Sequence, residues 1–283
     1  MKKQELRGRG RMKKLSTISA LHYGKLVFRS LLFCLALILY IVGRARGLSD
    51  PFRFLSGMGW LLGCIALVFA LEMLLRFFPS RYESMGCQKQ FKRNYRPCEG
   101  VEEGLAKRHL HLGTHRSTLA VLGAWLGLNG VFAALYFTGL IDEGILLLIS
   151  LFYSVSDMIC ILFFCPFQTW FMKNKCCGSC RIYNWDYAMM FTPLVLIPNP
   201  IARALFAMAL LLLITWEISV LLHPERFSTA TNACLSCENC REKLCHHKRQ
   251  LRGFLKRNRE RLRLAEKLQL LRSRLLPRDK DGE

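Results

Sequence analysis

Thirteen cysteines occur in this sequence of 283 residues, and seven of them fall into two tight groups. Cysteines two residues apart can bind one soft metal ion, because a short turn directs both thiolates inward while its backbone N–H groups stabilise their charge. A strongly apolar stretch separates the two groups. If that stretch is a membrane hairpin, both groups emerge on one face and can share a metal ion. The candidate metal ligands are Cys176, Cys177, Cys180, Cys237, Cys240 and Cys245, with Cys165 and Cys234 as additional candidates.

Zinc fits this spacing, with Cys177 and Cys180 pairing with Cys237 and Cys240. Four thiolates around one zinc ion form a closed tetrahedral site, which is structural because it leaves no open position for chemistry. Such a site would hold the two ends of the hairpin together. We therefore predict a structural zinc site as the first interpretation.

An iron–sulfur cluster is the alternative. The four cysteines from Cys234 to Cys245 approximate the ferredoxin run of three closely spaced cysteines followed by a fourth. The last gap is one residue longer than in ferredoxins, and no proline follows Cys245. Both interpretations stay open, and zinc is favoured.

The composition combines 52% hydrophobic residues with a formal net charge of +21. These values fit apolar membrane spans separated by basic loops. Five apolar runs approach the roughly 20 residues that cross about 30 Å of hydrocarbon, and a sixth is shorter and contains a proline. We therefore predict an all-α, polytopic bundle of about six transmembrane helices. The predicted spans are 26–42, 55–78, 119–141, 145–164, 187–197 and 201–222.

Lysine and arginine are distributed unevenly between the predicted loops. With six crossings, thirty-five of these residues fall on one side, and only Arg44, Arg46 and Arg53 fall on the other. Short cytoplasmic loops are enriched in lysine and arginine, so we predict a multi-pass protein of the cytoplasmic membrane with both termini in the cytoplasm. The clustered cysteines are then cytoplasmic too. Thiols stay reduced in that compartment, which favours metal ligation over disulfides.

The chain after the last span ends in a basic helix with leucines at intervals of three and four residues. We expect it to bind the lipid bilayer at its anionic surface. Nucleic acid is a less favoured partner, because no recognition fold or aromatic stacking platform accompanies this helix. The predicted parts of the chain are a basic N-terminus (1–25), the transmembrane bundle (26–222) with a cytoplasmic loop (79–118), a cysteine-rich metal-binding segment (223–247) and the basic amphipathic tail (248–283).

Asp157 is an ionisable residue inside a predicted span, and Ser150 and Ser154 precede it at helical spacing. Such a stripe could line a proton or ion path, or it could form hydrogen bonds that hold helices together. We expect Arg29 to extend its charge to the membrane interface. The charged residues considered as counterparts of Asp157 are Glu72, Arg76 and Glu217.

Three motifs around the clustered cysteines carry a resemblance to known proteins. They are CPFQTWFMKNKCCGSCRIYNWD at 165–186, HPERF at 223–227, and Cys237-x-x-Cys240-x-x-Lys-Leu-Cys245 after Thr231 and Asn232. Over roughly residues 120 to 250, the chain resembles a family of uncharacterised bacterial polytopic integral membrane proteins. The resemblance implies a polytopic membrane protein without indicating an activity. Its pattern favours Cys237, Cys240 and Cys245 over Cys234 as ligands, which weakens the ferredoxin interpretation.

These features predict an integral membrane protein that acts as a binding or scaffold component with a structural metal site. The first alternative is an iron–sulfur electron-transfer component that works with a partner subunit in the membrane. The second is a transporter that uses Asp157. The sequence contains no nucleotide-binding glycine loop, zincin helix motif or serine nucleophile motif, so no catalytic residue is assigned and enzyme activity stays open.

Overall fold

The computed structural model describes residues 17–47, 59–79, 87–98, 103–173 and 180–236. The chain divides into two compact units, Met1–Glu242 and Lys243–Glu283. The second unit lies outside the described residues, and with it the predicted amphipathic tail. The following description therefore concerns the first unit.

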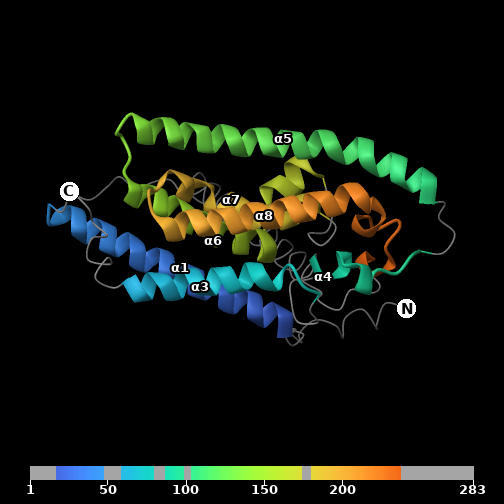
Figure 1. The fold of residues 1–283 in the computed structure, drawn as a ribbon, viewed down its shortest axis with the longest axis horizontal. Helices are drawn as coiled ribbons and strands as arrows, with labels where there is room; N and C mark the ends of the chain where they lie inside the picture. The colour runs from blue at the N-terminus through green and yellow to red at the C-terminus, as the bar shows by residue number, and fades with distance from the viewer. Residues whose placement is uncertain (1–16, 48–58, 80–86, 99–102, 174–179, 237–283) are drawn as a thin grey trace, which may run out of the picture. The chain divides into compact units, whose positions relative to one another are not determined.

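Within the described ranges the chain is mostly helical and contains no β-strand, which confirms the predicted all-α class. The long helices are α1 (Thr17–Ala45), α3 (Gly59–Leu75), α5 (Glu103–Phe137), α6 (Glu143–Leu162) and α8 (Pro200–Leu222) (Figure 1). The short elements are α4 (Cys87–Gln90), η2 (Lys92–Asn94), η3 (Phe167–Phe171), η5 (Arg181–Trp185), α7 (Asp186–Phe191), η6 (Thr192–Leu196), η7 (Pro224–Phe227) and η8 (Ala233–Leu235).

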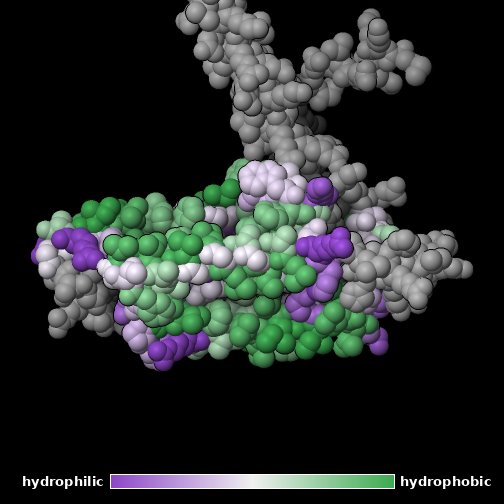
Figure 2. Space-filling view, turned by 90° about the horizontal axis from the view of Figure 1, so that it is seen from above, coloured by the Kyte–Doolittle hydropathy of each residue, from purple (hydrophilic) through white to green (hydrophobic). Residues whose placement is uncertain are grey.

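Four of the described helices are long and apolar enough to span a membrane. A shorter apolar helix, Gly63–Leu75, lies within α3. Figure 2 shows that hydrophobic residues cover the middle of the described surface, whereas hydrophilic residues gather toward its two ends. This distribution is the one expected of a protein surrounded by lipid. The four candidate spans are Ser19–Ala45, His115–Phe137, Glu143–Leu162 and Pro200–Leu222.

Helices α1 and α6 pack against each other along their lengths and run in opposite directions. Tyr23, near the start of α1, has its ring 6.2 Å from that of Phe163, which follows the end of α6. Further along, the rings of Phe33 and Phe152 are 6.1 Å apart. The start of α1 therefore lies beside the end of α6.

The ends of these helices follow local sequence signals. Asp142 caps α6, because its side chain accepts a hydrogen bond from the backbone N–H of Ile145. Asn199 caps α8 in the same way and is followed by Pro200 at the first helical position. After α5, Gly139 adopts a positive φ of 74°, a left-handed conformation that stops a helix and that glycine adopts without steric cost.

The predicted short span 187–197 forms α7 followed by the 3₁₀ helix η6. Both elements pack against α6 and α8, and Tyr187, Met190 and Leu194 are buried. The two elements together rise roughly 19 Å, which is less than the roughly 30 Å of a hydrocarbon core. A complete crossing by this segment stays a prediction.

The predicted loop 79–118 is only partly irregular. Its second half belongs to α5, which begins at Glu103, well before the predicted start of the third span at residue 119. Its first half contains α4 and η2, and this part packs against η7 after the last span. We call the residues 87–98 and 224–236 together the cap.

Candidate functional site

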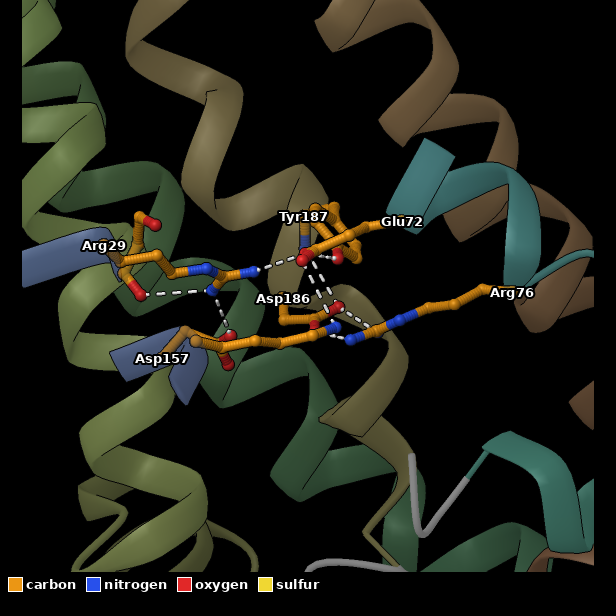
Figure 3. Close-up of polar contacts among 8 residues, drawn as sticks. Arg29, Glu72, Arg76, Asp157, Asp186 and Tyr187 are labelled. Atoms are coloured by element: carbon orange, nitrogen blue, oxygen red, sulfur yellow. Dashed lines mark hydrogen bonds and ion pairs between the residues drawn. The ribbon is translucent and has the colours of Figure 1, made fainter. Parts of the chain in front are cut away.

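Arg29 is the centre of a group of charged side chains buried between α1, α3 and α6. Its side chain is only 2% exposed. One terminal nitrogen, Nη2, lies 2.9 Å from Oε2 of Glu72, and the other, Nη1, lies 3.1 Å from Oδ2 of Asp157. Nη1 also donates a hydrogen bond to the backbone carbonyl of Ser154 at 3.2 Å. One guanidinium group thus joins three helices (Figure 3).

Tyr187 and Lys25 complete this group, which we call the charge cluster: Lys25, Arg29, Glu72, Asp157 and Tyr187. The Tyr187 hydroxyl donates a hydrogen bond to Oε2 of Glu72 at 2.8 Å. Nζ of Lys25 lies 3.3 Å from the second oxygen of the same carboxylate. Both oxygens of Glu72 are therefore paired, and α7 is tied to α1 and α3.

Arg76 forms a second buried ion pair next to the charge cluster. It follows the last residue of α3 and pairs with the Asp186 carboxylate through both terminal nitrogens, each at 2.7 Å. Its guanidinium carbon also lies 4.5 Å from the centroid of the Tyr187 ring, a cation–π geometry. Figure 3 shows Arg29 and Arg76 approaching Tyr187 from opposite sides.

Arg181 forms the third pair, with Glu217 of α8. Nη2 of Arg181 lies 2.5 Å from Oε2 of Glu217, and Nε1 of Trp185 donates to the other carboxylate oxygen at 2.7 Å. Arg181 directly follows Cys180 in the chain. The end of one cysteine group is therefore attached to the last long helix.

A fourth pair lies at the opposite end of α1. Arg44 pairs with Asp142, the N-cap residue of α6, and the Tyr40 hydroxyl donates a hydrogen bond to the same Asp142 oxygen at 3.0 Å. This pair is much less buried than the charge cluster, since the Arg44 side chain is 50% exposed.

The burial of Arg29 corrects one expectation from the sequence. We expected this arginine to extend to the membrane interface, but it lies ten residues inside its candidate span, about 15 Å along the helix, and both of its ion-pair partners are internal. The sequence of α1 contains a signal for the burial of Arg29, because residues that are polar or small recur at spacings of three and seven and so share one face of the helix. The structure buries this face, which consists of Ser19, His22, Arg29, Ala36 and Gly43.

The stripe Ser150, Ser154 and Asp157 makes contacts between helices. The Ser150 hydroxyl donates to the backbone carbonyl of Met190 at 2.8 Å, and Asp157 is held by Arg29. The sequence offered three charged residues as counterparts of Asp157. Of these, Glu72 is linked to Asp157, because Arg29 pairs with both carboxylates. These contacts are of the kind that hold helices together.

The cap is held together by Asn232, a fully buried residue. Its side-chain amide donates to the backbone carbonyls of Lys89 at 3.0 Å and Arg226 at 2.9 Å, while its Oδ1 accepts from the backbone N–H of Cys234. Backbone hydrogen bonds from Cys98 to Thr231, and from Ala233 to Arg96, join the same two segments. The first half of the predicted loop is therefore fixed to the chain that follows α8.

Most of the predicted metal ligands lie outside the described residues, namely Cys176, Cys177, Cys237, Cys240 and Cys245. Cys180 is described and buried. Among the described residues, no group of three or more His, Cys, Asp or Glu side chains is placed to hold a metal ion. The predicted site therefore stays a prediction.

The two additional candidates, Cys165 and Cys234, differ in their contacts. The Cys165 sulfur accepts a hydrogen bond from the backbone N–H of Gln168 at 3.3 Å, a contact that stabilises negative charge on sulfur. The Cys234 sulfur lies 3.0 Å from the backbone carbonyl of Asn94 and donates to it. A donating thiol carries its proton, so Cys234 is the poorer candidate for a thiolate ligand.

The comparisons with known proteins give no relative: no family model, curated protein or solved structure matches the chain.

Proposed function

We propose that this chain is a polytopic protein of the bacterial cytoplasmic membrane and acts as a binding or scaffold component. A structural zinc ion held by cysteines on the cytoplasmic side would stabilise the face that it presents there. The proposed ligands come from the two cysteine groups: Cys177, Cys180, Cys237 and Cys240, with Cys176, Cys245, Cys165 and Cys234 as further candidates. The resemblance found in the sequence favours Cys237, Cys240 and Cys245 over Cys234.

The observation that carries this proposal is that the described flanks of both cysteine groups contact one short segment, residues 88–94. After the first group, the Asn184 side chain donates to Oε1 of Gln90 at 3.1 Å. At the start of the second group, Asn232 donates to the Lys89 carbonyl and Cys234, the first cysteine of the group, donates to the Asn94 carbonyl. Two groups with neighbouring flanks can supply ligands to one ion, as four-thiolate zinc sites require.

The charge cluster and the two neighbouring ion pairs of Arg76 and Arg181 support a scaffold role more than transport. Each carboxylate of Glu72, Asp157, Asp186 and Glu217 already pairs with an arginine. A buried ion pair fixes the relative position of helices when both partners and their hydrogen bonds are in place. A carboxylate that carried ions would need to exchange this partner during every cycle.

Metal analysis of protein purified without oxygen tests the proposal. Near one zinc per chain without visible absorption is expected, whereas iron with acid-labile sulfide would identify the electron-transfer alternative. Cys177→Ser and Cys240→Ser should each lower the metal content and the stability together. Cys34→Ser and Cys64→Ser are matched controls, because these cysteines are exposed on the apolar helices α1 and α3. Full metal content in both site variants would overturn the paired site.

The transporter alternative has its own test. Asp157→Asn removes the charge of the carboxylate that Arg29 contacts, while the amide oxygen can still accept a hydrogen bond. On the scaffold interpretation, this variant lowers stability and no flux of protons or ions depends on it. Flux into vesicles that the unmodified chain supports and the Asp157→Asn variant does not would favour transport.

A further inference from the structure

A short basic turn, Phe91–Arg96, lies in the cap. Its sequence is Phe-Lys-Arg-Asn-Tyr-Arg. The side chains of Lys92, Arg93 and Arg96 are exposed. Within the described part of the chain, none of these three forms an ion pair with a carboxylate. The turn thus carries three cationic groups that no described acidic residue neutralises.

The backbone of this basic turn is held on both sides. The Asn94 side chain donates to the Gln88 carbonyl at 2.6 Å, and the backbone N–H groups of Asn94 and Tyr95 donate to the Phe91 carbonyl. The Arg96 carbonyl accepts from the N–H of Ala233 at 2.8 Å. The three cationic side chains therefore project from a fixed backbone.

Phe91 sets the depth of the basic turn relative to the membrane. Its ring lies 5.1 Å from the ring of Trp216, a buried residue of α8. Trp216 is six residues before Leu222, the end of this candidate span, which corresponds to about 9 Å of helix. Because Phe91 packs at the level of the span, the cationic residues that follow it lie near the surface of the bilayer.

Two described acidic residues in this region have contacts with residues outside the basic turn. Glu217, next to Trp216 in the chain, is held by Arg181 and Trp185. Glu225, in the other half of the cap, has one carboxylate oxygen 3.3 Å from Nδ1 of His223. Within the described ranges, neither of these carboxylates pairs with a cation of the basic turn, which leaves its positive charge for a ligand.

We infer that the basic turn binds the phosphate headgroups of anionic phospholipids in the membrane leaflet that borders the cap. Arginine and lysine both bind phosphate well, and arginine can do so through two parallel hydrogen bonds. At the depth of the basic turn, the phosphate groups at hand are those of lipid headgroups, whereas free phosphate would have to bind from solution. This inference does not depend on the metal site or on the scaffold role.

The experiment uses the full chain in phosphatidylcholine vesicles that contain a trace of spin-labelled phosphatidylglycerol. The fraction of motionally restricted label measures lipid held by the protein. Lys92→Gln combined with Arg93→Gln should weaken the preference for phosphatidylglycerol over phosphatidylcholine, by roughly five-fold for each charge removed. Because both side chains are exposed, the thermal stability of this variant should stay unchanged.

The matched control is Arg116→Gln combined with Lys173→Gln, which removes the same charge from two exposed residues, one at the start of the candidate span His115–Phe137 and one between α6 and α7. Its preference for phosphatidylglycerol should match that of the unmodified chain. An equal loss in the two double variants would overturn the inference, because the effect would then be diffuse charge attraction. Release of the lipid by millimolar inorganic phosphate would also overturn it, since the turn would then bind phosphate from either source.

Discussion

Arg44 of α1 pairs with Asp142 of α6 fifteen residues from the position at which Arg29 pairs with Asp157. Because the spacing is the same on both helices, the two ion pairs fix a single antiparallel register over about 22 Å. A shift of either helix by one turn would separate both pairs at once. The two pairs differ in burial, because the Arg29 side chain is buried whereas the Arg44 side chain is half exposed.

Replacing Arg29 with methionine should destabilise the protein strongly. The variant leaves Glu72 and Asp157 without the cation between them, and removing one partner of a buried ion pair typically costs about 3–5 kcal/mol. The free energy of unfolding in detergent measures this loss. Arg44→Met is the matched control at the exposed pair and should lower the free energy of unfolding much less, because solvent screens an exposed ion pair. Equal losses in the two variants would contradict the role assigned to Arg29.

Replacing the whole buried triad should be far less harmful than replacing its centre. Arg29→Met with Glu72→Leu and Asp157→Leu removes the three charges together and leaves Lys25, which is 27% exposed, and the Tyr187 hydroxyl without Glu72. Apolar replacements of complete buried pairs are often neutral or stabilising. We expect the triple variant to recover most of the stability lost in Arg29→Met. Thermal unfolding of both variants side by side tests this. A triple variant less stable than the single one would show that the charge cluster does more than pair its own charges.

Asp142 has two separable roles, the cap of α6 and the ion pair with Arg44. Asp142→Ser keeps a capping oxygen and loses the charge, so it should cost under about 1 kcal/mol. Asp142→Ala loses both and should cost about 1 kcal/mol more. Unfolding measurements on the two variants separate the roles. If serine and alanine are equally harmful, the cap contributes nothing.

Asn232→Ala should loosen the cap. The variant leaves the partly buried carbonyls of Lys89 and Arg226 without their donors, and a fully buried unsatisfied group costs about 1–3 kcal/mol, which is the upper limit for each here. Limited proteolysis should then cut segment 87–98 faster. Asn199→Ala is the matched control, because it removes an exposed asparagine cap at the start of α8. Unchanged cleavage in Asn232→Ala would contradict its role in joining the two halves of the cap.

Cys234 should be dispensable for metal binding. Its thiol donates to the Asn94 carbonyl, and a serine hydroxyl can donate in the same direction. Cys234→Ser is therefore expected to keep full metal content and near-normal stability, unlike Cys177→Ser. Metal analysis of the two purified variants tests the difference. Loss of metal in Cys234→Ser would place Cys234 in the ligand set and favour the ferredoxin-like interpretation.

The long apolar helices were predictable because hydropathy is a property of each segment by itself. The predicted spans 145–164 and 201–222 coincide with α6 and α8 to within two residues, whereas α1 begins nine residues before the predicted span 26–42 and ends three residues after it. The extension of α5 back to Glu103 was not predicted, because a polar helix outside the membrane leaves no hydropathy signal. Six complete crossings and the sidedness of the termini remain predictions.

The candidate site was less predictable, because its contacts join residues far apart in the chain. Asp157 was recognised as unusual, but its partner Arg29 lies 128 residues earlier and was assigned to the membrane interface. Hydropathy does not show which face of a helix meets which neighbour. The Asn232 contacts across the cap are equally remote in sequence, since Lys89 lies 143 residues away. The cysteine spacing, by contrast, was visible at once, although the residues that would settle its geometry lie outside the described ranges.

The position of Arg29 also has a consequence for how the chain is made. Helix α1 is synthesised before α3 and α6, so its arginine enters the membrane before either carboxylate partner exists, at a cost of about 2.5–3.5 kcal/mol for a charge at the centre of a span. Glu72 follows after 43 residues, and Asp157 only after 128. The first helix is therefore expected to stay beside the insertion machinery until α3 arrives, and to reach its final place only when α6 has been made.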